Sequence, residues 1–134
     1  MPALLLLCAL FASEESAVLD VIQRLFDAMA AHDAAALQSV LLPEGRVVSV
    51  RADGVLRGSS HPEWAARIAA SKDSLRETIR DPKVLIQGRI ASVWAPYDFY
   101  RDGQRSHGGI DSFSLVKTAD GWRIATLVYT VETR

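Results

Sequence analysis

The sequence of 134 residues has a single cysteine, Cys8, and no block of like charge. One thiol excludes an internal disulfide and the zinc sites that need several thiolates. The 15 basic and 16 acidic side chains are interspersed. Such a pattern creates no field that would gather nucleic acid or an anionic membrane surface, so we expect neither partner.

Motifs for phosphate, cofactor and nucleophile chemistry are also missing. No glycine-rich loop precedes a helix, and no Gly-x-Ser-x-Gly turn occurs. A metal would have to use His107 with Asp98 and Asp111, which do not follow the spacing of a known metal motif. His32 and His61 fall at helix ends, where we expect surface positions. We therefore expect no metal and no cofactor.

No apolar run is long enough to cross a bilayer. The longest, residues 3–12 (ALLLLCALFA), has the length of a signal-peptide core. It lacks a preceding Lys or Arg, and its small-residue cleavage pattern is poor. Two interpretations stay open for residues 1–12: a signal peptide of an exported, periplasmic protein, or a hydrophobic extension of the first helix in a cytoplasmic protein.

Residues 13–134 form one predicted domain, because 49% apolar content in a chain of this length suits a single core. Helical periodicity dominates its first half. Ser13 is a plausible N-cap for a helix ending near His32, Asp33 caps a second helix that runs to Leu41, and His61-Pro62-Glu63 begins a third.

Strands alternate with these helices and then fill the second half. We expect strands at 46–51, 55–57, 75–79 and 84–87, with residues 58–60 as a loop. A long meander follows from Arg89 to Val131. Helices gathered on one side of a long antiparallel sheet define the α+β class.

The meander contains two tight turns, Arg101-Asp102-Gly103-Gln104 and Thr118-Ala119-Asp120-Gly121. Asp-Gly between β-branched and aromatic runs is a strong hairpin signal. A two-residue loop at Asp102-Gly103 would pair Asp98 with His107 and Trp94 with Asp111. Alternation then predicts one face that carries Ile90, Trp94, Asp98, Tyr100, His107, Asp111, Phe113, Leu115, Trp122, Ile124, Thr126, Val128 and Thr130.

The opposite face of the predicted meander is also largely apolar. It would carry Ala91, Val93, Tyr97, Phe99, Ile110, Val116, Leu127, Tyr129 and Val131. The helices can cover only one face, so a second copy of the same sheet is the simplest cover for the other, and we predict a homodimer. A monomer that tolerates exposed apolar side chains is the competing interpretation.

Two glycines, Gly108-Gly109, interrupt this face. Glycine pairs within strands often mark a bulge, which would shift the register by one residue. In that case Asp98 and His107 would lie on the face opposite Asp111.

The order of elements resembles the NTF2-like superfamily, the cone-shaped α+β fold shared by nuclear transport factor 2, ketosteroid isomerase, scytalone dehydratase and the SnoaL-like cyclases. The likeness runs from about Ser13 to the C-terminus. The segments that carry it are His32 to Leu37, Phe113 to Lys117 and Gly121 to Ile124. The run Tyr97-Asp98-Phe99-Tyr100 with His107 and Asp111-Ser112-Phe113 is similar to the bacterial group of putative lumazine-binding proteins. The resemblance implies an NTF2-like cone, N-terminal helices packed on a strongly curved antiparallel sheet, with a pocket between them.

Polar residues that point into such a cone are the candidate site. A carboxylate at Asp98 could fix the tautomer of His107 and raise its pKa, and Asp111 could act as a second carboxylate. A structural ion pair beside the turn is the alternative for Asp98 and His107. Asp111 needs hydrogen-bond donors if it is buried, either from the protein or from a ligand.

Aromatic residues could hold a flat heterocycle such as a pterin or flavin precursor, or could simply be core. They are Trp94, Tyr97, Tyr100, Phe113 and Tyr129. The leading hypothesis is a homodimeric protein that binds a hydrophobic or heterocyclic small molecule. One alternative is a SnoaL-like or isomerase-like enzyme with His107 as base, Asp98 as its orienting group and Asp111 as acid. A second is a homodimeric assembly module.

Overall fold

The computed structural model describes the backbone of residues 2–133 and the side chains of residues 14–133. Its helices are α1 (Pro2–Ala31), α2 (Ala34–Val40) and α3 (His61–Ala70). Its strands are β1 (Leu41–Arg51), β2 (Leu56–Ser60), β3 (Leu75–Ile79), β4 (Lys83–Gln87), β5 (Ile90–Arg101), β6 (Gln104–Thr118) and β7 (Gly121–Val131). The predicted order of helices and strands is confirmed, except that residues 58–60, expected as a loop, belong to β2.

The first helix supplies much of the core. One face of α1 is buried and includes Val18, Val21, Ile22, Leu25, Phe26 and Met29. The helix ends where His32 adopts a φ of 52°, and the Asp33 carboxylate then accepts a hydrogen bond from the Ala36 amide at 3.1 Å. The side chains of residues 1–12, the possible signal peptide or hydrophobic extension, lie outside those described. No helix in the described part of the chain is long and apolar enough to span a membrane.

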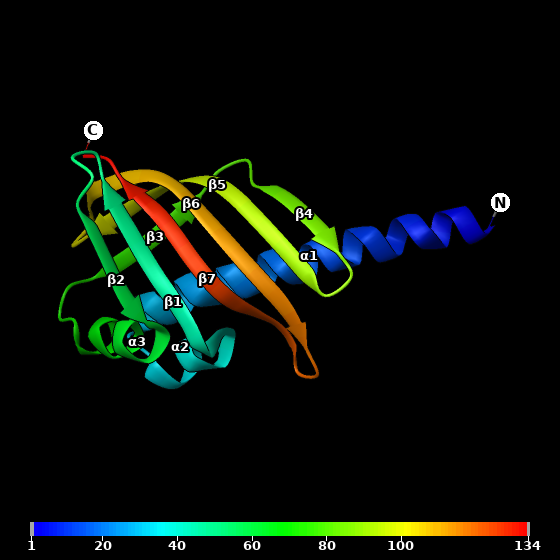
Figure 1. Ribbon diagram of the computed structural model, residues 1–134, viewed down its shortest axis with the longest axis horizontal. Helices are drawn as coiled ribbons and strands as arrows, with labels where there is room; N and C mark the ends of the chain where they lie inside the picture. The colour runs from blue at the N-terminus through cyan, green and yellow to red at the C-terminus, as the bar shows by residue number, and fades with distance from the viewer. Residues whose placement is uncertain (1, 134) are drawn as a thin grey trace.

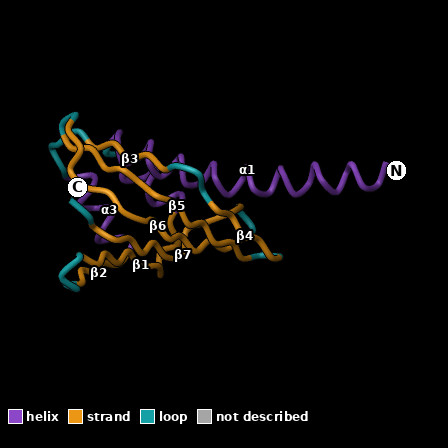
Figure 2. The backbone as a smooth tube through the Cα atoms, turned by 90° about the horizontal axis from the view of Figure 1, so that it is seen from above, coloured by secondary structure: helices purple, strands orange, loops and turns teal. Residues whose placement is uncertain are grey.

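Seven strands form one curved sheet in the order β2-β1-β7-β6-β5-β3, with β4 also paired to β5 (Figure 1). All neighbours are antiparallel except β1 and β7, which run parallel. Figure 2 shows the sheet curling, and β3 at one edge contacts α1. The helices lie on the concave side, so the described fold is the α+β cone.

The predicted register of β5 with β6 is wrong over most of its length. The Asp102-Gly103 turn is as expected, with φ values of 52° and 80°, and Arg101 pairs with Gln104. One residue, Ser106, is then extra, because Tyr100 pairs with Arg105 but Phe99 pairs with His107. This bulge shifts all later pairs by one, so Asp98 lies opposite Gly108 instead of His107.

The shift exchanges the two faces of β5. Its concave side carries Ala91, Val93, Ala95, Tyr97 and Phe99, all buried. A second irregularity, between Ser114 and Leu115, leaves Ala125 of β7 unpaired, so Leu127 and Tyr129 also face the cone. The outer face is less apolar than expected, since serine and threonine alternate there with Ile90, Trp94 and Val128.

The N-terminus of α3 packs into the sheet, which makes the surface position expected for His61 wrong. Its side chain is 1% exposed, and its Nδ1 lies 2.6 Å from the carbonyl oxygen of Leu42. Gly45 leaves the space for the ring, because a Cβ there would lie 2.2 Å from its Cε1. The helix start therefore acts as a core contact between α3 and β1.

At Gly109 of β6, both the backbone conformation and the surrounding space exclude a side chain. Its φ is +146°, and an added Cβ would lie 2.3 Å from Oγ1 and 2.7 Å from the carbonyl oxygen of Thr130. Gly54 has a φ of +85° but open space around it. Only Gly109 combines an unusual conformation with close backbone approach.

We predict that Gly109→Ala lowers the free energy of unfolding by about 3 kcal/mol or more, because backbone strain and overpacking each cost about 1–3 kcal/mol. The matched control Gly54→Ala should cost only the strain, about 1–2 kcal/mol. Urea denaturation measures both. Equal losses would show that Thr130 moves aside freely.

Candidate functional site

The cone holds a cavity of about 110 Å³ between the concave face of the sheet and helices α1 and α3. Its lining residues are Met29, Trp64, Ile68, Glu77, Phe99, Arg101, His107, Leu127 and Tyr129. An apolar cavity of about 150 Å³ suffices for one benzene molecule. The inserted part of any ligand is therefore no larger than about one ring.

The bulge at Ser106 brings His107 into this cavity. Its imidazole stacks on the Phe99 ring at 5.0 Å between centroids and meets the edge of Tyr97 at 5.9 Å. Burial lowers the pKa of His107, and the positive charges of Arg101 and Arg105 lower it further. The imidazole is thus kept neutral near pH 7, where it can accept a proton.

A pair of carboxyl groups forms the polar part of the site. Glu77 of β3 lines the cavity, and its side chain hydrogen-bonds the carboxyl of Asp111 on β6, which is 1% exposed. Glu77 is half-buried as a residue, but its Oε2 is fully buried. Outside this pair, neither this oxygen nor Oδ2 of Asp111 has a hydrogen-bond partner among the described residues.

Burial raises the pKa of both carboxyls, so the pair keeps a proton at a pH where exposed carboxyls are ionised. It raises the pKa of Asp111 to about 6, although the hydrogen bond with Glu77 works in the opposite direction. Burial also raises the pKa of Glu77 well above its usual value, and the neighbouring Asp111 raises it again. Two adjacent buried carboxyls cannot both ionise cheaply, so near pH 7 they share one proton.

Two tyrosines complete the polar wall. Tyr97 donates its hydroxyl to the carbonyl oxygen of Thr130 at 2.6 Å, and Tyr129 packs edge-on against Tyr97 at 5.9 Å. Burial raises the pKa of both phenols, and the charges of Asp111 and Glu77 add to this. Both remain neutral hydrogen-bonding groups.

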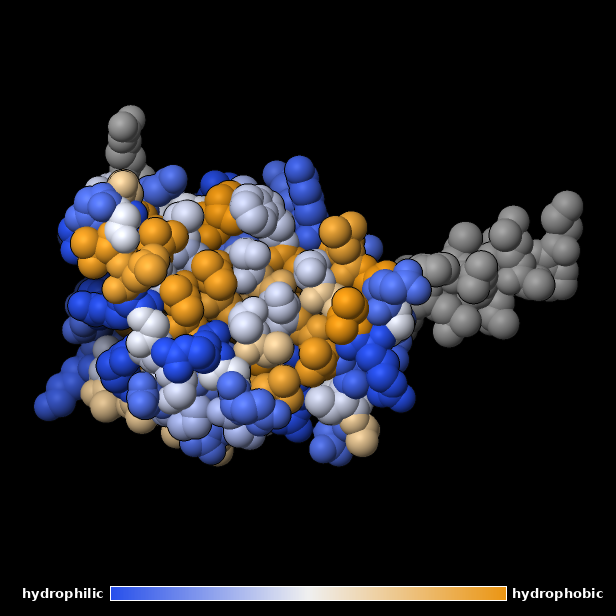
Figure 3. Space-filling model, viewed as in Figure 1, coloured by the Kyte–Doolittle hydropathy of each residue, from blue (hydrophilic) through white to orange (hydrophobic). Residues whose placement is uncertain are grey.

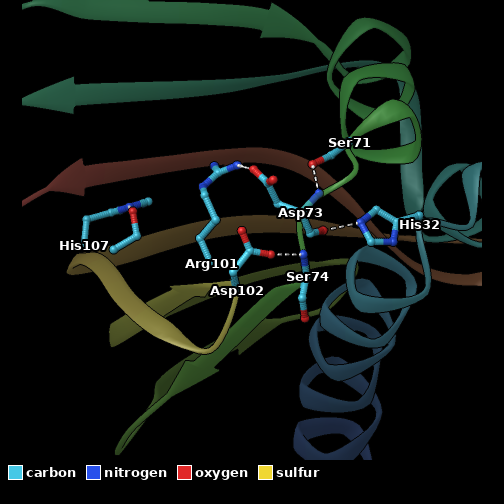
Figure 4. A network of polar contacts seen from close by, with 8 residues as sticks. His32, Ser71, Asp73, Ser74, Arg101, Asp102 and His107 are labelled. Atoms are coloured by element: carbon cyan, nitrogen blue, oxygen red, sulfur yellow. Dashed lines mark hydrogen bonds and ion pairs between the residues drawn. The ribbon is translucent and has the colours of Figure 1, made fainter.

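Figure 4 shows the polar network that fixes the rim of the cavity. Arg101 pairs with the Asp73 carboxylate at 2.7 Å, and the backbone oxygen of Asp73 lies 2.7 Å from Nε2 of His32. Asp102 accepts a hydrogen bond from the Ser74 amide at 2.9 Å. The end of α1, the segment before β3 and the β5–β6 turn are thereby joined beside His107.

The predicted acid/base residues are only partly brought together. His107 and Asp111 lie on the same face of β6, as expected. Asp98 lies on the outer face of β5, where it pairs with Arg80 and, at 2.8 Å, with Arg105. The hydrogen bond from Arg105 holds the pKa of Asp98 below its usual value. Asp98 therefore does not orient His107.

The predicted ligand-binding aromatics separate in the same way. Tyr129 lines the cavity, whereas Tyr97 and Phe113 are 1% exposed core residues behind it. Trp94 is 53% exposed on the outer face, and the guanidinium of Arg76 lies 3.9 Å from the ring centre of Tyr100. The changed register of β5 against β6 explains why Trp94 and Tyr100 lie on the outer face.

The sequence analysis missed Glu77 and Phe99. A signal for Glu77 was present, because the expected strand Leu75–Ile79 alternates and places Glu77 on the same face as two apolar residues. The predicted register placed Phe99 on the face opposite His107, whereas in the structure the two residues are paired. Within residues 14–133, no group of three His, Cys, Asp or Glu side chains is placed to hold a metal ion.

The pH dependence of stability should report the Asp111 proton. Because the folded state holds this proton more tightly than the unfolded chain, its contribution to stability is fully present below about pH 4 and is lost as the pH rises through about 6. The free energy of unfolding of the wild type should thus fall relative to that of Asp111→Asn by about 1–2 kcal/mol between pH 5 and pH 8.

Urea denaturation at both pH values measures this difference. Asp98→Asn is the matched control, because the lowered pKa of Asp98 keeps it ionised over this interval and its difference from wild type should stay constant. A constant difference for Asp111→Asn as well would contradict the raised pKa.

Comparison with known proteins identifies the fold and the family. Residues 13–130 match the family model described as "Putative lumazine-binding". An NTF2-like protein of unknown function from Shewanella baltica has a TM-score of 0.71 and 16% identity, over 92% of this chain and 98% of that one. An NTF-2 like protein of unknown function from Silicibacter pomeroyi has a TM-score of 0.70 and 21% identity, over 91% and 98%.

A third structure, described as a putative dehydratase from the NTF2-like family of Streptomyces avermitilis, has a TM-score of 0.73 and 17% identity, over 89% of this chain and 96% of that one. At such identities the likeness shows the fold and carries no activity. No curated protein matches the sequence. The chain belongs to the family of putative lumazine-binding proteins, and its fold is that of NTF2-like proteins.

Proposed function

We propose that the protein binds a small hydrophobic or heterocyclic molecule in the cavity of the cone. The observation that carries this proposal is the carboxyl of Glu77, which lines the cavity and whose buried Oε2 has no partner among the described residues besides Asp111. A ligand N–H that donates to the cavity side of this carboxyl gains a net contribution of about 0.5–1.5 kcal/mol. Trp64, Phe99 and Tyr129 supply apolar walls for a flat ring.

The family description agrees with such a ligand. A lumazine is a flat heterocycle whose ring N–H groups donate hydrogen bonds, which is what the Glu77 oxygen accepts. The cavity of about 110 Å³ takes about one ring. A bicyclic ligand would insert one ring toward Glu77 and leave the other near Arg101 and His107.

Proton transfer is the second candidate function. His107, a neutral imidazole, and Glu77, which shares a proton with Asp111, line the same cavity. A base and an acid on one wall suit the general acid/base catalysis of a SnoaL-like or isomerase-like enzyme. In this mechanism His107 takes a proton from the substrate, Glu77 donates one, and Asp111 positions Glu77. Asp98 has no part in it.

We also propose a homodimer that covers the outer face of the sheet. Apolar side chains gather on this face in Figure 3, and the exposed fractions of Ile90, Trp94 and Val128 are 62%, 53% and 44%. Leu85 of β4, opposite Ser92, extends the same surface and is 74% exposed. Exposed apolar side chains that gather on one face commonly mark interfaces. In the assembly-module alternative, this surface is the whole function.

The ligand proposal predicts that small heterocycles bind to the cavity and nowhere else. Lumazine and single-ring uracil, titrated against the protein and followed by NMR, should shift the resonances of Tyr129 and Trp64. Glu77→Gln should weaken binding about two- to tenfold, since the hydrogen bond from the ligand contributes about 0.5–1.5 kcal/mol. Asp98→Asn, a change on the outer face, should leave the affinity unchanged.

Equal affinities for wild type and Glu77→Gln would contradict the proposed site. The same samples prepared in D₂O distinguish an enzyme from a protein that only binds the ligand. Incorporation of deuterium into carbon positions of the bound molecule, abolished by His107→Ala, would indicate the enzyme.

The dimer proposal predicts that the wild type sediments as a dimer at micromolar concentration and that Trp94→Asp sediments as a monomer. A stable interface buries about 800 Å² on each partner, and a charge at its centre is strongly unfavourable. The matched control is Val55→Asp, because Val55 is 52% exposed in the turn after β1 and away from the sheet face. A monomeric wild type would show that the apolar face needs no second copy.

A further inference from the structure

Strand pairing sets the depth of each polar side chain in the cone. Glu77 of β3, Phe99 of β5 and His107 of β6 are paired across the three strands, so they form one row on the concave face. Arg101 follows Phe99 by two residues on β5, which places it on the same face about 7 Å from that row. All four residues line the cavity. The cavity therefore has a carboxyl and an imidazole at one level and a guanidinium at its rim.

The guanidinium of Arg101 has hydrogen-bond donors available for a ligand. Its central carbon lies 5.7 Å from the ring centre of Phe99, over the ring. A guanidinium carries five N–H donors. The ion pair with Asp73 uses Nη1 alone, at 2.7 Å from Oδ2 (Figure 4). Within residues 14–133, no second group accepts a hydrogen bond from this guanidinium.

The carboxylate of Asp73 approaches Arg101 from outside the cavity and is weakly held. Asp73 is not among the lining residues, and the two side chains of the pair are 42% and 48% exposed. Exposed ion pairs add little stability, because water and salt screen them. The backbone of Asp73 is fixed separately by the Ser71 hydroxyl at 3.3 Å and by Nε2 of His32 at 2.7 Å. The carboxylate can therefore leave Arg101 while its segment stays in place.

The charges at the rim favour an anion over a cation. Burial lowers the pKa of His107, and the positive charges of Arg101 and Arg105 lower it further. The carboxylate of Asp102 in the adjoining turn is not part of the lining and accepts a hydrogen bond from a backbone amide at 2.9 Å. Glu77 is the one carboxyl among the described lining residues, and it lies one row deeper.

We propose that the ligand of the cone is a small heterocyclic acid whose carboxylate is bound at the rim by Arg101, with Asp73 as the competing internal carboxylate. This inference rests on the proposed binding function and specifies its ligand class. The ring occupies the cavity of about 110 Å³ beside Phe99 and Tyr129, with a ring N–H toward Glu77. A planar carboxylate accepts two parallel hydrogen bonds from a guanidinium, which a neutral amide cannot do.

The test compares two probes of nearly the same shape. Orotate is a uracil ring with a carboxylate at C6, and orotamide carries a neutral amide there. Dissociation constants come from NMR titration of the full chain at pH 7 and low ionic strength, where the carboxylate is ionised and little screened. The wild type should bind orotate about tenfold more tightly than orotamide, because charge-assisted hydrogen bonds are the stronger ones.

Variants assign this preference to the rim. Arg101→Gln should abolish it, so that orotate and orotamide bind equally. Asp73→Asn should raise the affinity for orotate about threefold, because it removes the carboxylate that competes for the guanidinium. Arg80→Gln is the matched control, since Arg80 pairs with Asp98 on the outer face, and it should keep the full preference. Circular dichroism and urea denaturation establish that each variant is folded.

The outcomes separate this inference from the general ligand proposal. Equal binding of orotate and orotamide by the wild type overturns it, as does a preference that survives Arg101→Gln. An unchanged affinity of Asp73→Asn for orotate also contradicts it. If uracil shifts the resonances of Trp64 and Tyr129 but neither carboxyl derivative binds, the acid ligand is wrong and the neutral-ligand site stands. If uracil, lumazine and orotate all fail to bind, both proposals fail together.

Discussion

The backbone pairing between β5 and β6 determines which side chains enter the cone, and one extra residue fixes that pairing. Ser106 lies between two hydrogen-bonded registers, one set by the Asp102-Gly103 turn and one that continues through the rest of the hairpin. Because side chains alternate along a strand, the shift exchanges Asp98 for Phe99 in the wall of the cavity. The stacked pair of Phe99 and His107 depends directly on this bulge.

A site built on this wall lowers the stability of the folded protein. Glu77 and Asp111 would stabilise the domain more as apolar residues of similar size, because burial penalises their charged forms. Natural proteins retain such groups where function requires them, and perturbed carboxyls in a cavity are typical of functional sites. The tight packing around them, with Tyr97 and Phe113 at 1% exposure, compensates for the cost.

The fold could be predicted from the sequence because its signals are local. Helical periodicity around Val18 and Leu25, the Asp33 cap and the Asp-Gly turn each depend on a few neighbouring residues, and each is confirmed. The site could not be predicted to the same degree, since it depends on register. The bulge at Ser106 has no glycine of its own, and the two glycines that suggested a bulge lie beyond it.

Long-range pairing limited the prediction in a second way. Glu77 and Asp111 come from strands separated by β5, and their contact exists only because the curved sheet brings β3 and β6 together inside the cone. Alternation within β3 is a signal that Glu77 faces inward, but no local pattern marks its partner. Tyr129 was a ligand-binding candidate as one of five aromatic residues able to stack on a flat heterocycle.

The parallel pairing of β1 with β7 has a consequence for how the protein is made. Val47 pairs with Leu127, about 80 residues later in the sequence, so β7, which is synthesised after both of its neighbours, lies in the middle of the sheet. Before β7 is in place, β1 and β6 each have an unpaired edge, and the sheet lacks a central strand. Non-local strand pairing of this kind slows folding and exposes edges that can pair with other chains. We therefore expect the nascent chain to remain vulnerable to aggregation until β7 has been synthesised.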